Sequence, residues 1–190
     1  MPASPAAPAA QSKVAPPFTP EQEAQHRNWF QASVLSGAGP LYDDGVLQIA
    51  TKLEVKGYVG KLSLFYRNIH STPANNISAT LNDAVGLVRI TESGAIPSSL
   101  APGAQASQVF QFECVKPAAP GPSLSLSYEN GGLGNRNESI RVPIAVTTFN
   151  EQLNLNGADF GSRWGKLTGP GQEAVEVFYP SAPIKAPVIN

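Results

Sequence analysis

The sequence predicts an all-β protein, an antiparallel β-sandwich with short flanking helices. Apolar and polar residues alternate in about seven or eight short runs between residues 41 and 147, as they do in strands that bury one face. The 17 glycines and 18 prolines supply turn signals between these runs. No helical period of apolar residues lies between the runs, which favours a sandwich over a sheet built from βαβ units.

The bulk composition fits one globular domain with extensions. Of the 190 residues, 42% are hydrophobic, which is enough to close a core. The net charge of -1 provides no field to hold a nucleic-acid backbone, so we expect no nucleic-acid partner. Cys114 has no second cysteine to pair with, and the N-terminus lacks a secretory signal, so we expect a cytosolic protein. No apolar run approaches the roughly 18 residues that cross a bilayer, and we expect no direct membrane insertion.

Residues 1–18 are predicted to form a linker, and residues 19–36 a leading segment with a short helix. The first 17 residues are almost entirely Ala, Pro and Ser, which prefer extended, polyproline-like states. Thr19-Pro20-Glu21-Gln22 combines an N-cap, a proline at the first helical position and a capping-box glutamine. We expect this helix to run to about Phe30 and to pack against the end of the domain.

The sandwich is predicted over residues 37–150. A tight turn at Asp44-Gly45 indicates a hairpin, and the strand after it spans 46–56. The next strand spans 61–67, with Leu62, Leu64 and Tyr66 facing the core. Further strands are expected at 77–82, 85–90, 105–115, 123–128 and 139–147, with a glycine-rich hairpin turn at 131–135.

Residues 151–190 are predicted to form a helical extension. Phe160, Trp164 and Leu167 are spaced like one face of a helix. We expect a second short helix over residues 173–178.

The sequence offers little for catalysis or metal binding. Nucleophilic catalysis needs a Ser or Cys held by a His, and the two histidines are His26 in the leading helix and His70 in a loop. Both are more simply explained as surface residues, because no second His or Cys stands at zinc spacing. Cys114 falls on an inward position and is interpreted as an inert buried thiol. We therefore expect no enzyme, no catalytic residue, no metal and no cofactor.

Two further clusters are interpreted as turns. Asp43-Asp44 lacks the alternating oxygen ligands and closing Glu of a calcium loop. The glycines at 131–134 lack the Lys-Ser/Thr of a phosphate-binding loop and the third glycine of a dinucleotide loop.

Phe65 is the candidate binding residue. It lies between Lys61 and Arg67 on the face of its strand that turns toward water. Single exposed aromatics are common, so both an incidental position and a binding role stay open at this point. Lys52 and Gln105 fall on outward positions of strands that could neighbour it. An aromatic platform with a cation and an amide suits a groove for a short peptide with an aromatic anchor.

The chain resembles the C-terminal appendage, or ear, of alpha-adaptin. The resemblance is carried by Gly45-Val46-Leu47-Gln48-Ile49 through Lys52, Leu64-Phe65-Tyr66-Arg67-Asn68, Gln105 through Phe112-Glu113-Cys114, Val142-Pro143-Ile144, and Asp159-Phe160 with Arg163-Trp164 and Leu167. It extends from about residue 41 to about residue 178. The Arg-Trp-x-x-Leu segment favours the alpha ear over the gamma and beta ears.

The resemblance implies an immunoglobulin-like β-sandwich subdomain over residues 37–150. In this family the sandwich is normally followed by a platform subdomain with a deep aromatic pocket for Asp-Pro-Phe-type motifs. The chain ends at Asn190, before a platform could form, so residues 151–190 would lead to an absent platform. The Ala/Pro-rich leader would be the end of the hinge that tethers such ears to the adaptor core.

The resemblance also implies a function and a site. In this family the sandwich binds Trp-x-x-Phe-type motifs of endocytic accessory proteins, and the site residues carry over as Lys52, Phe65 and Gln105, with Gln48 at the edge. Arg67 stands where the family commonly has glycine, and its bulk could narrow the groove or contact an acidic flank of the peptide. The chain would then be a non-enzymatic clathrin adaptor module for endocytosis and vesicle-mediated transport. Through its hinge it would join a heterotetrameric adaptor complex, cytoplasmic and peripheral at clathrin-coated pits of the plasma membrane.

Three other interpretations stay open. The sandwich could be a structural spacer that positions the platform and binds nothing itself. It could be the ear of a related gamma or beta adaptin. A carbohydrate-binding module would want several coplanar exposed aromatics, whereas the chain has two tryptophans, one of them in a helical pattern.

Overall fold

The computed structural model of the protein describes residues 14–131, 133–150, 154–167 and 169. The chain divides into two compact units, Met1–Glu151 and Gln152–Asn190. The described part of the first unit contains one α-helix, nine strands and one 3-10 helix. The described part of the second contains one α-helix.

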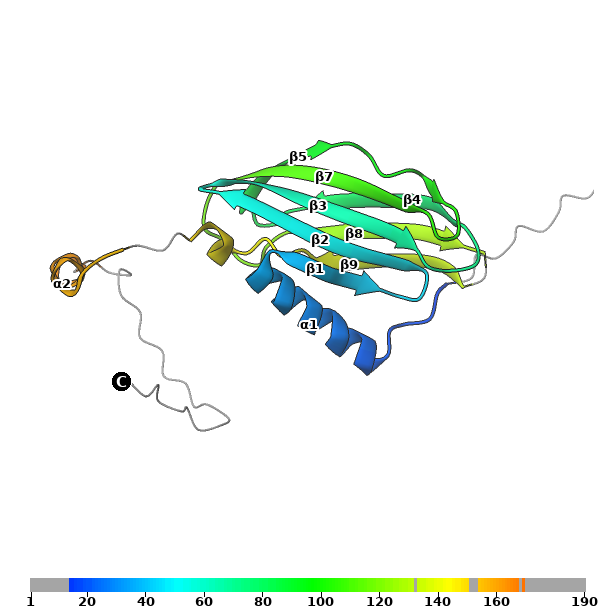
Figure 1. Cartoon of the computed structure of the whole chain (residues 1–190), viewed down its shortest axis with the longest axis horizontal. Helices are drawn as coiled ribbons and strands as arrows, with labels where there is room; N and C mark the ends of the chain where they lie inside the picture. Colours follow the sequence, from blue (N-terminus) through cyan, green and yellow to red (C-terminus); the bar gives the residue numbers. More distant parts are fainter. Residues whose placement is uncertain (1–13, 132, 151–153, 168, 170–190) are drawn as a thin grey trace, which may run out of the picture. The chain divides into compact units, whose positions relative to one another are not determined.

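Two antiparallel sheets pack face to face in the first unit (Figure 1). The five-stranded sheet has, in spatial order, β1 (Ala38–Asp43), β2 (Leu47–Lys56), β3 (Val59–Asn68), β7 (Gln105–Cys114) and β5 (Val88–Ser93). The four-stranded sheet has β6 (Ser99–Leu100), β4 (Ala74–Asn82), β8 (Ser123–Asn130) and β9 (Gly134–Arg141). This arrangement confirms the predicted all-β sandwich.

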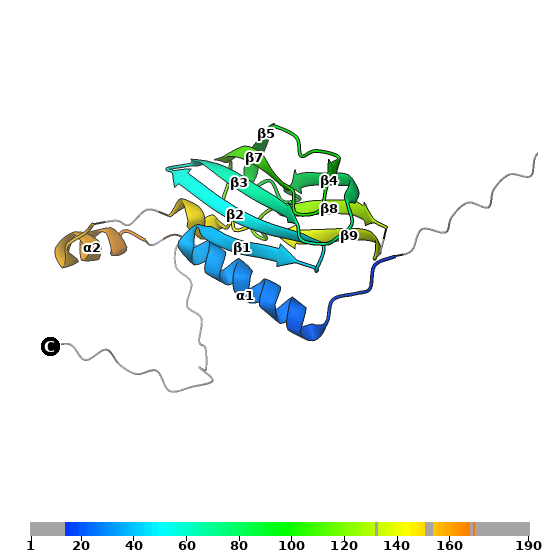
Figure 2. The same cartoon turned by 45° about the vertical axis from the view of Figure 1, so that its right-hand side comes forward.

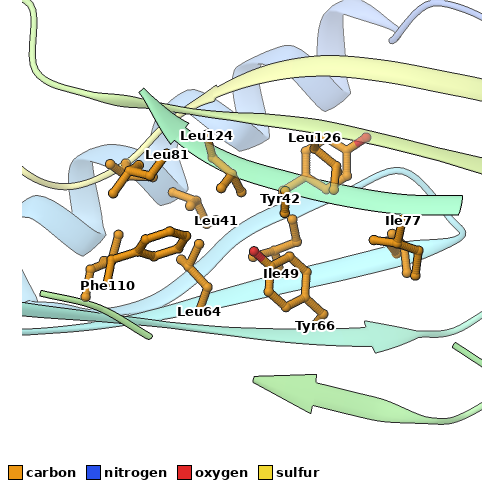
Figure 3. Packing of buried hydrophobic residues seen from close by; sticks show 14 of the residues in the cluster. Leu41, Tyr42, Ile49, Leu64, Tyr66, Ile77, Leu81, Phe110, Leu124 and Leu126 are labelled. Carbon is orange, nitrogen blue, oxygen red and sulfur yellow. The ribbon is translucent and has the colours of Figure 1, made fainter. Parts of the chain in front are cut away.

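The core lies between the two sheets and follows from the alternation in the sequence. Inward residues of the five-stranded sheet, such as Leu64 and Phe110, meet Leu124 and Leu126 of β8 (Figure 3). Each of these four side chains is at most 2% exposed. Full burial of such a side chain contributes roughly 1.5–3 kcal/mol relative to exposure, so these strands cannot shift by one residue without losing the core.

A buried carboxylate links the two sheets. Asp44, in the turn between β1 and β2, accepts hydrogen bonds from the backbone N–H groups of Val46 (3.0 Å) and Leu47 (2.9 Å). Its other oxygen, Oδ2, accepts from the hydroxyls of Tyr42 (2.8 Å) and Tyr128, and lies 3.3 Å from Nε of Arg136. Because Tyr128 lies on β8 and Arg136 on β9, this one side chain holds the β1–β2 hairpin to the opposite sheet.

The leading helix α1 (Pro20–Ser36) begins at the predicted capping box. The Gln22 N–H donates to Thr19 Oγ1 at 3.3 Å, and the Thr19 N–H donates to Gln22 Oε1 at 2.9 Å. The helix is about one and a half turns longer than predicted. It ends only at Gly37, whose φ of 72° gives the left-handed C-cap, because nothing before Gly37 breaks the helix.

Helix α1 packs along β1, an edge strand of the five-stranded sheet, rather than against the end of the domain (Figure 2). His26 anchors it: its Nε2 lies 2.9 Å from the carbonyl oxygen of Asp43, and its ring stacks on Tyr42 at 5.2 Å. The expectation of a surface residue is therefore wrong for His26, which is half-buried. The sequence does not show that Tyr42 and Asp43 lie opposite the helix.

Residues 14–18 contact the domain, whereas the sequence suggested a linker up to residue 18. The Ala15 N–H donates to the carbonyl oxygen of Asn135 on β9 at 2.9 Å. Arg136 donates to the carbonyl oxygen of Pro16 at 2.7 Å, and its guanidinium lies 4.7 Å from the ring centroid of Phe18. The first 13 residues of the predicted linker lie outside the described residues.

The strand predicted over 139–147 is wrong. β9 starts earlier, at Gly134, and ends at Arg141, and a 3-10 helix η1 (Val146–Phe149) follows. Pro143 has no N–H to donate to a ladder, which explains the early end. The early start was missed because Arg136 and Glu138 are polar at inward positions, and Arg136 is buried there by its ion pair with Asp44.

β5 lies three residues later than predicted, at Val88–Ser93 instead of 85–90. Oδ1 of Asp83 accepts the N–H groups of Val85 (3.1 Å) and Gly86 (3.0 Å), and its Oδ2 accepts that of Val88 (2.6 Å). These bonds hold residues 83–87 in a turn.

The described part of the second unit contains α2 (Gly157–Trp164), where the sequence predicted a helix. Asn156 caps it by accepting the Asp159 N–H at 2.8 Å, and Phe160 stacks on Trp164 at 5.7 Å. The helix predicted over residues 173–178 lies outside the described residues.

Stability should fall as the pH rises above about 10. Burial, and for two of them the neighbouring charge of Asp44, raises the pKa of Tyr42, Tyr66 and Tyr128 above the ordinary value of 10.0. The unfolded chain then releases these protons before the folded chain does, so each tyrosine removes about 1.4 kcal/mol of stability per pH unit above 10. Urea unfolding followed from pH 8 to 11 should show little change below pH 9 and then a loss whose slope approaches about 4 kcal/mol per pH unit at pH 11. An unchanged midpoint over this range would contradict this burial.

Candidate functional site

All five candidate residues lie on one face of the molecule, the outer face of the five-stranded sheet. Gln48 and Lys52 stand on β2, Phe65 and Arg67 on β3, and Gln105 at the start of β7. All five are exposed, because the residues between them on each strand point into the core. Phe65 is 46% exposed.

The pairing register arranges this face in rows that cross β2, β3 and β7. Three successive rows are Gln48-Arg67-Gln105, Ala50-Phe65-Ser107 and Lys52-Ser63-Val109. Side chains directly opposite in such rows have Cβ atoms roughly 4.5–5.5 Å apart, so Arg67 lies between two amides. Phe65 has small neighbours, Ala50 and Ser107, on both sides. An aromatic ring that stands between small residues leaves open space beside each of its faces.

A groove of about 570 Å³ lies beside Phe65. Gln48, Arg67 and Gln105 also line it, so the structure brings four of the five predicted residues together. The groove has a further wall that the sequence did not suggest, formed by Gln25 and Trp29 of α1, while Pro40 and Ala50 belong to the strands beneath. Gln25 and Trp29 are four residues apart and so share one face of the helix, which is the one signal in the sequence that could have indicated them.

Lys52 does not line this groove. Its Nζ lies 3.0 Å from Oε1 of Glu54, and Nζ of Lys61 lies 2.7 Å from Oε2 of the same carboxylate. The hydrogen bond from Lys61, and then that from Lys52, holds the pKa of Glu54 below its ordinary value of 4.5. Lys52 would have to leave Glu54 to meet a ligand in the groove.

Arg67 lines the groove next to two fixed polar side chains. Gln48 Nε2 donates to Oδ2 of Asp43 at 2.8 Å, and Oδ1 of Asp43 accepts the Gly45 N–H at 2.8 Å. Gly45 has a φ of 84°, which this turn requires. Among the described residues, no carboxylate lies within ion-pair distance of Arg67. Of the two charged groups that line the groove, the carboxylate is already hydrogen-bonded and the guanidinium lacks a counter-ion.

A second hollow of about 630 Å³ lies at the other end of the same face. Four of its charged residues are paired within the protein, Lys61 with Glu54 and Arg89 with Glu113 at 2.8 Å, while Lys56 has no ion-pair partner among the described residues. It also lacks an exposed aromatic platform comparable to Phe65. We therefore regard the groove at Phe65 as the better candidate site.

The described residues contain no cluster of three His, Cys, Asp or Glu side chains that could hold a metal ion. Cys114 is a free, partly buried thiol. His70 Nδ1 lies 2.9 Å from Oγ1 of Thr72 in the loop before β4. No helix in the described ranges is long and apolar enough to span a membrane.

Comparison with known families decides what kind of domain this is. Residues 37–150, the whole sandwich, match the family described as Adaptin C-terminal domain. The chain belongs to this family. The match confirms the resemblance that the strands suggested, and it starts just after α1.

Alpha subunits of AP-2 complexes are similar to this adaptin domain. The alpha-2 subunit of Dictyostelium discoideum is 32% identical over 79% of the chain, the alpha-1 subunit of Arabidopsis thaliana 28% over 83%, and the alpha subunit of Schizosaccharomyces pombe 25% over 74%. The chain spans only about 15% of the length of these relatives. Among solved structures, the GAE domain of GGA2p from Saccharomyces cerevisiae is similar at 14% identity with a TM-score of 0.48, over 56% of this chain and 99% of that one.

Both lysines that hold Glu54 should contribute to its lowered pKa. The hydrogen bond from Lys61 is the first cause and that from Lys52 the second, so Lys61→Met and Lys52→Met should each move the Glu54 pKa upward, toward 4.5. A carboxyl-carbon NMR titration of both variants measures this. A Glu54 pKa that stays unchanged in both variants would contradict the two ion pairs.

Proposed function

We propose that this adaptin domain binds short aromatic peptide motifs, of the Trp-x-x-Phe type, that are carried by accessory proteins of clathrin-mediated endocytosis. The observation that carries the proposal is the exposed ring of Phe65 between two small residues, in a groove lined by amides and a guanidinium. The similarity to AP-2 alpha subunits supports the setting. In that setting the chain is the appendage of a heterotetrameric clathrin adaptor. The adaptor lies in the cytoplasm, at the cytosolic face of coated pits.

The chemistry of the groove fits a peptide better than a compact substrate. An aromatic side chain of the ligand would pack on Phe65, and Gln105 would donate to or accept from the ligand backbone. Arg67 offers a forked donor to a carboxylate at the flank of the motif. The one carboxylate among the described residues that line the groove, that of Asp43, is already hydrogen-bonded to Gln48 and the Gly45 backbone, so the proposed role is binding without catalysis.

A groove of this size supports only weak binding to a single motif. One apolar anchor with a few hydrogen bonds in a small interface corresponds to a dissociation constant in the micromolar range, about -8 kcal/mol. Useful selectivity would then come from several motifs and several appendages acting together. Tethering through the leader would increase the effective concentration of the domain at the coat.

Phe65→Ala should abolish peptide binding. In an NMR titration of the labelled protein with a Trp-x-x-Phe peptide, we expect shifts around Phe65, Arg67 and Gln105, and their loss in the variant, because the apolar anchor is removed. Tyr58→Ala is the matched control: Tyr58 is 65% exposed, lies in the β2–β3 turn and is outside the groove lining. A folded protein without shifts at millimolar peptide would favour a structural spacer.

Glu54→Gln should strengthen binding of a peptide with an acidic flank. The variant releases Lys52 from its ion pair, and exposed pairs of this kind are weak, so we expect a gain of up to about fivefold. Glu113→Gln is the control, because it removes a carboxylate from the same sheet without freeing Lys52. Isothermal titration calorimetry with both variants measures the difference. Equal gains in the two would show a general charge effect and exclude a role for Lys52.

A further inference from the structure

Helix α1 contributes a wall to the candidate groove although it lies outside the residues that match the family. The match covers 37–150, and α1 spans Pro20–Ser36. Two of its residues, Gln25 and Trp29, line the same groove as Phe65. The groove is thus built from a sheet face that belongs to the family match and a helix that precedes it.

Trp29 is held in place by a chain of ring contacts. The ring of Trp29 lies 5.7 Å from that of His26, which stacks on Tyr42 at 5.2 Å. Tyr42 in turn donates its hydroxyl to the buried carboxylate of Asp44. At the next residue of the helix, the guanidinium of Arg141 lies over the ring of Phe30 at 4.8 Å. A side chain fixed in this way loses little conformational freedom when a ligand binds.

We propose that Trp29 is a second aromatic wall of the peptide groove, so that an extended peptide passes between α1 and the sheet with one apolar side chain against Phe65 and the other against Trp29. This inference rests on the proposed function and specifies its ligand. Two aromatic surfaces from different elements line one groove of about 570 Å³. Such an arrangement fits a peptide with two aromatic side chains better than one with a single anchor.

Besides its two aromatic side chains, the ligand should carry a negative charge, as the charges of the groove indicate. Arg67 lines it without an ion-pair partner among the described residues, while Asp43 is hydrogen-bonded to Gln48 and to the Gly45 backbone. A carboxylate next to the aromatic pair would therefore be favoured, and a lysine there would be disfavoured. The ligand class is an acidic peptide with two spaced aromatics.

The other hollow beside α1 does not compete for this role. It measures about 260 Å³, lies between α1 and β9, and is lined by Phe30 together with Arg141, which already contacts that ring. Its remaining charged residues are also paired, Glu23 with Arg27 at 3.9 Å and Glu138 with Arg136 at 3.2 Å.

The indole N–H signals of the labelled protein test the proposal without a mutation in the groove. The chain has two tryptophans, Trp29 and Trp164, and Trp164→Phe assigns their signals. On titration with an unlabelled peptide containing Asp-Trp-Ala-Ala-Phe, we expect the Trp29 signal to shift together with the Phe65 backbone amide. The Trp164 signal should stay unchanged. A Trp29 signal that does not move while the amides around Phe65 do would overturn the second wall and leave the proposed function standing.

Calorimetry with variants gives the second test. Trp29→Ala should weaken this peptide about tenfold, and Trp29→Phe should keep most of the affinity. Trp164→Ala is the control and should bind as the unaltered chain does. Of two peptides with Ala in place of either the Trp or the Phe, one should lose less affinity in Trp29→Ala than the parent peptide does, because it already lacks the side chain that packs on Trp29. If Phe65→Ala binds normally, the proposed function fails. If Phe65→Ala does not bind the peptide and Trp29→Ala binds it normally, the proposed function stands and only the role of Trp29 as a second wall is excluded.

Discussion

The carboxylate of Asp44 is the interaction on which the rest of this domain depends. It accepts a hydrogen bond from the Val46 N–H, which closes the β1–β2 turn, and further hydrogen bonds from the hydroxyls of Tyr42 and Tyr128. It also pairs with Arg136, which reaches on to the carbonyl oxygen of Pro16. Removing either member of a buried charge pair leaves the other unpaired in a low-dielectric interior, at a cost of about 3–5 kcal/mol. Two sheets, the β1–β2 hairpin and the segment at Pro16 are thereby linked through one side chain.

The same carboxylate is connected to the candidate groove through a series of ring contacts. Tyr42, which donates its hydroxyl to Asp44, stacks on His26, and the ring of His26 contacts that of Trp29 on the helix wall. The opposite wall, Phe65, is placed by the register of β2, β3 and β7, which the core fixes independently. The groove is therefore preorganised from two directions, which favours binding because little order has to be created when a peptide arrives.

Much of the fold could be predicted from the sequence, and the reasons for the failures are physical. The alternation of apolar and polar residues predicted β2, β3, β7 and β8, because each of these strands buries one face in the core. The same alternation predicted that Phe65 points outward. β9 was misplaced because Arg136 occupies an inward position that only its distant partner Asp44 makes tolerable. Trp29 was missed because a helix pattern does not show which sheet face its tryptophan will meet. The alternation of residues predicts only that Lys52 points outward. It does not show that the side chain of Lys52 extends to Glu54 and forms an ion pair there.

The most direct test of the account is an isotope-filtered NOE experiment on the labelled protein with an unlabelled Trp-x-x-Phe peptide. It reports which protein protons lie close to the peptide, independently of any mutation. The account predicts NOEs from the aromatic protons of the peptide to Phe65 and to the flanking Ala50 and Ser107. NOEs confined to other surfaces, such as the second hollow near Arg89 and Glu113, would contradict it.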